Sequence, residues 1–190
     1  AQAVDAVDYY NLTIDGSGTK TLSAGTIDIG GSNGEGVLTV DAGCVFAIGD
    51  NTITHTSLHD FSTTYNSSIV GTVTLNNGTW TPTYGQYGQL ATSGSITVTG
   101  TGTIYFKGGG GHTLGTFTEG SGTVYYSRNG SMTVVSDTYS HLIIDGTSGT
   151  KTLGGAIDVN GDLTLTNNGG GLLDVSGSNY GISLAGTWTN

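Results

Sequence analysis

The sequence predicts an all-β protein built as a β-solenoid, in which short strands stack in successive coils. Three observations support this class. Gly accounts for 35 of the 190 residues and Pro for one, and the glycines separate short runs rich in Thr, Val, Ile and Tyr. Such runs are typical of short strands joined by tight turns. No long window places apolar residues at helical spacing, and one long motif occurs twice, as in folds assembled from a repeated supersecondary unit.

The repeated motif opens the chain and returns in its second half. The first copy, Tyr9–Leu22, contains Leu-Thr-Ile-Asp-Gly followed by Gly-Thr-Lys-Thr-Leu. The second copy, Tyr139–Leu153, contains Leu-Ile-Ile-Asp-Gly followed by the same Gly-Thr-Lys-Thr-Leu, with one residue inserted after Gly146. Two copies this similar indicate one structural unit used twice.

Strand-like runs recur in the second half at a step of about 20 residues, which is the period of a solenoid coil. These runs are Thr103–Phe106, Thr123–Tyr126, Leu142–Ile144, Leu163–Leu165 and Ile182–Leu184. About nine coils stacked about 4.8 Å apart would form a rod roughly 40–45 Å long. The first half keeps this step poorly, which leaves a Greek-key β-sandwich as the alternative fold.

We expect a single solenoid-like domain over residues 1–190, with three departures from regularity. Residues 1–8 lack turn chemistry and are predicted to form an N-terminal arm. Residues 51–68 and 82–95 are predicted to be excursions or long loops. Pro82 has no N–H to donate to a sheet, so it is expected at a strand end or edge.

Charge and cysteine content exclude several classes of protein. Fourteen acidic residues against four basic ones give a net charge of −10, which argues against nucleic acid and anionic membranes as partners. No run is apolar and long enough to insert into a membrane. Cys44 is the only cysteine, so no intrachain disulfide exists, and a buried hydrophobe is the expected role. The chain begins Ala-Gln-Ala, which is compatible with a secreted protein whose signal peptide has been removed.

Metal candidates are few. His55, His59 and Asp60 could ligate zinc or copper if a strand placed them on one face, although ordinary surface histidines explain the pattern better. Asp recurs near turns and could supply oxygen ligands to Ca²⁺, but turn formation explains Asp there without an ion. We therefore predict no cofactor, with Ca²⁺ as the alternative.

Catalytic motifs are absent from the sequence, and we do not expect an enzyme. Thr-x-Thr pairs occur, but they do not recur at one fixed step, so the sequence does not predict a flat ladder of threonines. Tyr105 and Tyr125 are expected to stack across neighbouring coils. Four sequons could accept N-linked glycans, at Asn11, Asn66, Asn77 and Asn129.

Phrases such as Gly120-Ser-Gly-Thr-Val-Tyr-Tyr126 and Gly186-Thr-Trp-Thr-Asn190 resemble the Gly/Thr-rich repeats of bacterial and archaeal surface adhesins and extracellular filament proteins. That resemblance implies a β-solenoid fold, a cell-surface location and a structural or adhesive role. It brings no catalytic residues.

The chain also begins and ends inside its own pattern, without an obvious polar cap, whereas open solenoid ends need covering. We therefore expect a structural subunit of an extracellular filament or matrix fibre, assembling head to tail by stacking of terminal coils, with strand addition by the N-terminal arm. The residues expected at the subunit contact are Ala1, Val4, Val7, Ile182, Leu184 and Trp188. The alternative is an adhesin or carbohydrate-binding module of a longer surface protein, with glycans or other surface proteins as partners.

Overall fold

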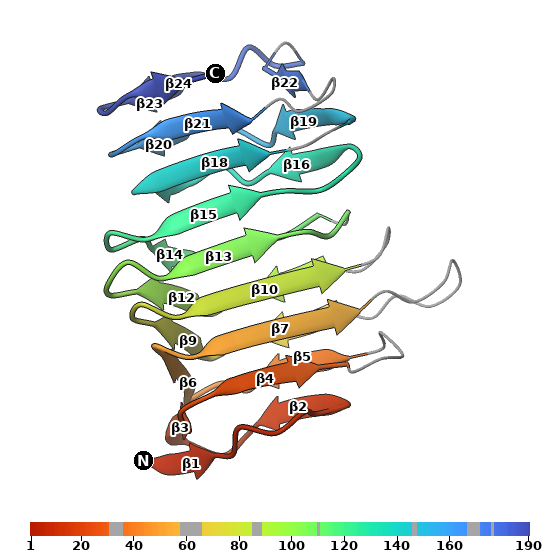
Figure 1. Cartoon of the computed structure of the whole chain (residues 1–190), viewed down its shortest axis with the longest axis vertical. Coiled ribbons are helices and arrows are strands. Elements are labelled where there is room, and N and C mark those ends of the chain that lie inside the picture. Colours follow the sequence, from red (N-terminus) through yellow and green to blue (C-terminus); the bar gives the residue numbers. More distant parts are fainter. Residues whose placement is uncertain are drawn as a thin grey trace.

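The protein is a β-solenoid of about seven turns, seen here in a computed structural model (Figure 1). The structure describes residues 1–30, 36–57, 66–84, 89–109, 111–145, 148–166, 172–175 and 177–190. Within these ranges there is no helix, and hence none long and apolar enough to cross a membrane. The two termini lie at opposite ends of the stack (Figure 1). The predicted fold class is confirmed, and the Greek-key alternative is wrong, because the paired strands of the described residues run parallel.

One sheet, sheet I, runs the whole length of the rod. Its eight strands are, in spatial order, β4 (Thr26–Ile29), β7 (Thr52–Ser57), β10 (Thr79–Tyr84), β13 (Thr103–Phe106), β15 (Thr123–Tyr126), β18 (His141–Asp145), β21 (Leu163–Thr166) and β24 (Trp188–Thr189). Each strand continues the ladder of the one before it, so sheet I is the spine of the fold.

Two further sheets cover the N-terminal half. Sheet II contains β1 (Gln2–Val4), β3 (Gly18–Leu22), β6 (Cys44–Gly49), β9 (Thr72–Leu75), β12 (Ser95–Val98) and β14 (Thr116–Thr118). Sheet III contains β2 (Asn11–Ile14), β5 (Val37–Val40), β8 (Asn66–Ile69) and β11 (Gln89–Thr92). In this half each turn of the chain visits sheets III, II and I in that order.

Two short sheets take these places in the C-terminal half. Sheet IV contains β16 (Met132–Val134), β19 (Thr150–Leu153) and β22 (Leu172–Asp174). Sheet V contains β17 (Thr138–Tyr139), β20 (Ile157–Val159) and β23 (Ile182–Leu184). The chain now visits sheets IV, V and I, so sheet IV stands in the place of sheet III and sheet V in the place of sheet II.

The core fills the interior between the three faces. Strand residues alternate between buried and partly exposed positions, as the two-residue period of a strand requires. Inward side chains stack from level to level in register, and one column of sheet I consists of Ile27, Ile53, Trp80, Ile104, Val124, Leu142 and Leu163. Burial of each large apolar side chain contributes about 1.5–3 kcal/mol, so these columns hold the levels together.

Short polar side chains bond the corners of successive turns. Asp50 Oδ1 accepts hydrogen bonds from the side chains of Asn76 and Asn77 and from the backbone N–H of Asn77, which lowers the pKa of this carboxyl. The corners are also close-packed. A Cβ on Gly78 would collide with the carbonyl oxygens of Gly49 and Asn51, so only glycine fits where one turn passes directly over another.

The turns differ in length, which corrects the estimate of nine coils. In the N-terminal half, Thr26 pairs with Thr52, and Thr52 pairs with Thr79. Further along the rod, Thr103 pairs with Thr123, and Thr123 pairs with His141. The partners in the first two pairs are further apart in the sequence than the partners in the last two. The constant step seen in the sequence therefore belongs only to the middle of the rod, and the longer turns reduce the number of coils.

The expected arm and excursions are largely part of the solenoid. Residues 1–8 do not form a free arm, because β1 pairs in parallel with β3 of the same chain. Residues 52–57 and 66–68 belong to β7 and β8, and residues 82–84 and 89–92 belong to β10 and β11. Residues 58–65 and 85–88 lie outside the described residues.

Pro82 sits inside β10, not at a strand end or edge, and the prediction for it is wrong. Its carbonyl oxygen accepts the Lys107 N–H, so the missing Pro82 N–H would face the same side, toward β13. The regular pairing of β10 with β13 ends at Trp80 and Ile104, before Pro82, as expected where one donor of the ladder is missing.

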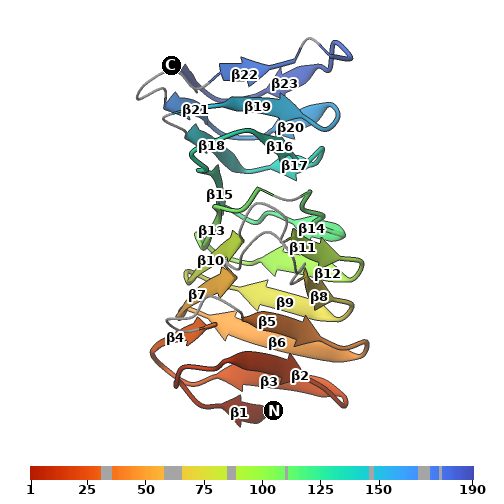
Figure 2. The ribbon, with the colours of Figure 1, turned by 90° about the vertical axis from the view of Figure 1, so that its right-hand side faces the viewer.

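Among the described residues, only sheet I crosses the level between β15 and β18. Sheet II ends at β14 and sheet III at β11, while sheets IV and V begin with β16 and β17 (Figure 2). We call this interruption the seam. Two buried tyrosines lie in it, with the Tyr126 and Tyr139 hydroxyls 3.0 Å apart. The Val135 N–H donates to Tyr126 Oη (3.1 Å), and Tyr139 Oη donates to the Val135 carbonyl (2.6 Å). The pair thus supplies hydrogen bonds where the sheets do not.

The two copies of the repeated motif lie on different faces of the solenoid. The first copy forms β2 and β3 on sheets III and II, and the second forms β18 and β19 on sheets I and IV. The second copy is thus rotated by one face. Both copies place a lysine on an inward position, and Lys20 Nζ and Lys151 Nζ donate to the carbonyl oxygens of Ser17 and Ser148, three residues earlier.

Candidate functional site

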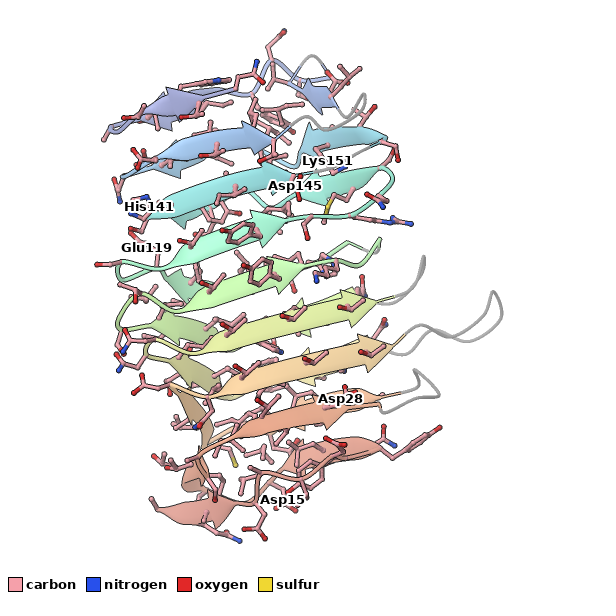
Figure 3. The ribbon with its side chains drawn as sticks, in the orientation of Figure 1. Asp15, Asp28, Glu119, His141, Asp145 and Lys151 are labelled. Carbon is pink, nitrogen blue, oxygen red and sulfur yellow. The ribbon has the colours of Figure 1, made fainter. Side chains whose placement is uncertain are left out.

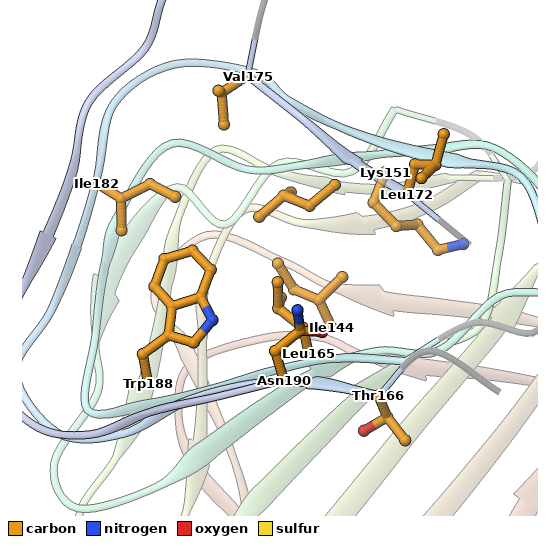
Figure 4. A pocket seen from close by; sticks show the side chains of 10 residues that line it. Ile144, Lys151, Leu165, Thr166, Leu172, Val175, Ile182, Trp188 and Asn190 are labelled. Atoms are coloured by element: carbon orange, nitrogen blue, oxygen red, sulfur yellow. The ribbon is translucent and has the colours of Figure 1, made fainter. Parts of the chain in front are cut away.

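The C-terminal end of the rod contains a hollow of about 340 Å³ (Figure 4). It lies inside the last levels, between strands of sheets I, IV and V. Most of its lining is apolar and consists of Ile144, Leu165, Leu172, Leu173, Val175, Ile182 and Trp188, with Lys151, Thr166 and Asn190. Leu172 is 63% exposed and Trp188 is 49% exposed. The core is therefore accessible at this end.

The aliphatic part of the Lys151 side chain lines the hollow, and its ammonium group points to backbone carbonyl oxygens. Its Nζ donates to the carbonyl oxygens of Gly130 (2.8 Å) and Ser148 (3.1 Å). Burial, with a smaller effect from the Arg128 charge, lowers the pKa of Lys151. The hollow thus offers a mainly apolar surface with a single cation at its wall, engaged with carbonyl oxygens.

The N-terminal end exposes apolar side chains beside carboxylates. Val7 is 54% exposed and Tyr10 is 53% exposed. The Asp28 N–H donates to Asp8 Oδ1 at 3.1 Å, and burial, then the Asp8 charge, raises the pKa of Asp28. The outer edge of β1 has no partner strand among the described residues.

The residues predicted for a subunit contact fall on these two ends. Ala1, Val4 and Val7 belong to the first level, where Ala1 and Val7 are exposed and Val4 is half-buried. Ile182 and Leu184 are half-buried in β23, and Trp188 begins β24. Their role in a contact stays a prediction.

His55 is a core residue and not a surface histidine. It lies fully buried in β7, and its Nε2 is 3.0 Å from the Gly36 carbonyl oxygen and 3.2 Å from Ser67 Oγ. Burial lowers the pKa of His55 to about 4. The other two candidate ligands, His59 and Asp60, lie outside the described residues. Where the structure describes the chain, no three His, Cys, Asp or Glu side chains gather as a metal site would require.

A second buried histidine was not singled out by the sequence. His112 stacks on Phe106 with ring centroids 4.9 Å apart, and its Nδ1 accepts the Leu90 N–H. Burial lowers the pKa of His112 to about 4. Both buried histidines are therefore neutral at pH 7 and serve the packing of the core.

The structure shows the predicted tyrosine stack and the exposure of the four sequon asparagines. Tyr105 and Tyr125 stack on the outer face of sheet I with centroids 4.2 Å apart, as predicted, so each covers one ring face of the other. All four sequon asparagines are exposed, namely Asn11, Asn66, Asn77 and Asn129. The Asn77 side chain is engaged with Asp50 and Thr101, which leaves it less accessible to modification.

A flat ladder of threonines does exist, contrary to the sequence-based expectation. Outward residues of sheet I align across five successive levels, from β4 to β15. One column contains Thr26, Thr52, Thr79, Thr103 and Thr123, and the two adjoining columns contain Thr54 with Thr81 and Thr56 with Thr83. We call these nine residues the Thr array. Turns of unequal length hide this alignment in the sequence, because the threonines do not recur at one spacing.

Comparison with models of known protein families, with curated proteins and with solved structures found no match for this chain. The β-solenoid class therefore rests on the structure itself, and function has to be argued from its surfaces.

Proposed function

We propose that this protein is a structural subunit of an extracellular filament or matrix fibre that grows by end-to-end stacking of its terminal coils. One observation carries the proposal. Among the described residues six large apolar side chains are exposed, and five of them lie at the ends of the rod. Val7 and Tyr10 are at the N-terminal end, and Leu172, Val175 and Trp188 are at the C-terminal end, where they surround or line the hollow. Exposed apolar surface concentrated in this way is typical of interaction sites.

Strand direction favours a head-to-tail arrangement. The paired strands of the described residues run parallel, so both ends of the rod expose strand edges of the same polarity. Stacking the N-terminal end of one copy on the C-terminal end of the next would continue each sheet in parallel. A contact of this kind joins two different surfaces, and a straight rod repeats it without closing into a ring. Its location outside the cell rests on the resemblance to surface-protein repeats.

Electron microscopy of the purified protein tests this proposal. We expect fibres with an axial repeat of roughly 34–38 Å, from seven to eight levels spaced about 4.8 Å apart. The net charge of −10 opposes association, so fibres should form more readily as salt screens this repulsion.

Two variants, one at each end of the rod, and one matched control test the proposed contact between successive copies. Val7→Asp and Trp188→Asp each place a carboxylate in the proposed apolar contact and should stop growth. Val70→Asp is the control, because Val70 is 47% exposed, close to the 49% of Trp188, but lies on a middle level. A mixture of the two end variants retains one sound joint and should yield dimers and no longer species.

The proposal fails if the unmodified protein remains monomeric at every concentration and salt level tested, or if Trp188→Asp polymerises as well as Val70→Asp. A protein that stays monomeric would instead favour the alternative, a module of a longer surface protein whose neighbouring coils cover the same ends.

A further inference from the structure

The Thr array is the most regular surface feature of the described residues. It consists of the nine threonines defined above, on the outer face of sheet I, and every one of them is exposed or half-exposed. Paired residues fix its register: Thr52, Thr54 and Thr56 on β7 lie directly opposite Thr79, Thr81 and Thr83 on β10. The array is therefore two-dimensional, with three positions along each of two central strands and a column that extends over five levels.

A solvated strand face does not by itself require threonine. Sheet III has the same parallel backbone, yet its first outward column contains Asn11, Val37, Asn66 and Gln89. The general preference of strands for threonine would act on both sheets alike. The second outward column of sheet III does contain two threonines in register, Thr13 and Thr39, followed by Ser68 and Ala91. Sheet I differs in the length of its Thr column, which spans five levels.

The array is rigid and free of charge. Threonine is stiff at χ1 because it is branched at Cβ, so its hydroxyl and methyl groups are held in place by the backbone. Charged or titratable side chains adjoin it: Asp28 on β4 pairs with Thr54, and His141 on β18 pairs with Thr123, with Asp145 on the same strand (Figure 3). Lys107, which follows β13, extends over the Tyr105 ring, with its Nζ 5.7 Å from the ring centroid.

The spacing of the threonine hydroxyls determines which ligand surface the array can match. Hydroxyls repeat about 4.8 Å apart from strand to strand and about 6.6 Å apart along a strand, since alternate residues share a face. Oxygen atoms in planes of crystalline ice repeat at distances close to these. An ionic mineral would require a charged face, which the threonines do not provide.

We propose that the Thr array binds a plane of ice, by holding water at its hydroxyl and methyl groups in positions that continue the crystal. The site lies along the rod and not at its ends, so this binding does not depend on filament assembly. In a fibre, successive copies would repeat the array along one side.

Sheet II offers a poorer template. Its outward hydroxyls form only two columns on the three levels from β9 to β14, with Thr72, Ser95 and Thr116 beside Thr74, Thr97 and Thr118, and Val45 and Ala47 end these columns at β6. Its register also shifts between Ala47 and Gly49, where β6 meets β9. The ordered part of sheet II is therefore narrower than the array on sheet I.

Thermal hysteresis and ice-crystal shaping, measured on the whole chain, test the proposal. We expect the unmodified protein to shape ice crystals and to produce a measurable freezing-point gap. The test variant is Thr54→Tyr/Thr81→Tyr, which should lose that gap because two large rings would stand in the centre of the array. Tyrosine already occupies the same outward column on β13 and β15, so the sheet accommodates it.

The matched control is Thr13→Tyr/Thr39→Tyr, a pair that lies in register on two neighbouring levels of sheet III. This variant should retain the full freezing-point gap, and circular dichroism should show both variants folded. The proposal is overturned if the unmodified protein has no effect on ice, or if test and control variants lose activity equally. A loss with Thr74→Tyr/Thr97→Tyr on sheet II, but none with Thr54→Tyr/Thr81→Tyr, would refute the assignment to sheet I.

Discussion

Removing one hydroxyl from the seam should destabilise the whole protein measurably. In Tyr139→Phe the ring stays and continues to fill the core, so no cavity forms. The Val135 carbonyl loses the donor that lies 2.6 Å away, and Tyr126 Oη loses a partner at 3.0 Å. Leaving a buried polar group without its partner costs about 1–3 kcal/mol. Val135 is half-buried, so water can satisfy part of its carbonyl, and we expect a loss of about 1–2 kcal/mol in the free energy of unfolding.

A double-mutant cycle separates the shared hydrogen bond from the rest. Tyr126→Phe removes the acceptor of the Val135 N–H and should cost a similar amount. Each single variant breaks the hydrogen bond between the two hydroxyls, so the double variant should cost less than the sum of the singles. A difference of about 0.5–1.5 kcal/mol is expected for one hydrogen bond between groups in contact.

Urea unfolding at pH 7, followed by circular dichroism, measures these effects. Tyr105→Phe is the control, because it lies on the outer face of sheet I and is expected to change stability by no more than about 0.5 kcal/mol. The seam also joins the two halves through one sheet alone, and solenoid stability depends on contacts between neighbouring levels. The Tyr139→Phe transition should therefore broaden or split. A single sharp transition with the stability of the unmodified protein would refute a stabilising role for the tyrosine pair.

Three further predictions concern single residues. His55 and His112 have pKa values lowered to about 4 from about 6.5 in the unfolded chain. Below pH 6.5 the unfolded state therefore binds more protons, and stability should fall between pH 6.5 and 4 by up to roughly 3 kcal/mol per histidine, as urea titrations at several pH values would show. Gly78→Ala should destabilise the protein by more than about 2 kcal/mol because the new Cβ would meet two carbonyl oxygens. Gly177→Ala should be nearly neutral because its Cβ would meet nothing within 4 Å, and thermal melts of the two variants would show the difference. Cys44 is buried, so a thiol reagent should label it no faster than the protein opens, and immediate labelling in the native state would contradict its position.

The class of fold was predictable because strand alternation and glycine turns are local signals. The run Cys44–Gly49 alternates buried and half-buried residues, as its sequence indicates. The same rule places His55 correctly when it is applied fully: His55 is two residues from Ile53, so both point inward. The prediction of a surface histidine failed because the polar composition of residues 51–68 was given more weight than this parity.

The register between turns could not be predicted, because it depends on corner lengths that the sequence does not reveal. Thr26 lies much further from Thr52 along the chain than Thr123 lies from His141, yet both pairs are direct neighbours on sheet I. A search at one fixed spacing misses such columns. The seam was equally hidden, because Tyr126 and Tyr139 belong to runs that resemble ordinary strands.

The two copies of the repeated motif lie on different faces of the solenoid, and this placement shows which structural unit is repeated. Since the same residues form strands of sheets III and II in one copy and of sheets I and IV in the other, the repeated unit is a strand with its corner, and it fits more than one face. Repetition of this unit therefore explains the backbone but not the chemistry of one face. On sheet I the second copy contributes His141–Asp145, without a threonine, while strands outside the motif contribute Thr52, Thr79 and Thr103. The threonines are aligned on one face by residues that the repeat does not supply, which is the pattern expected if that face has a function of its own.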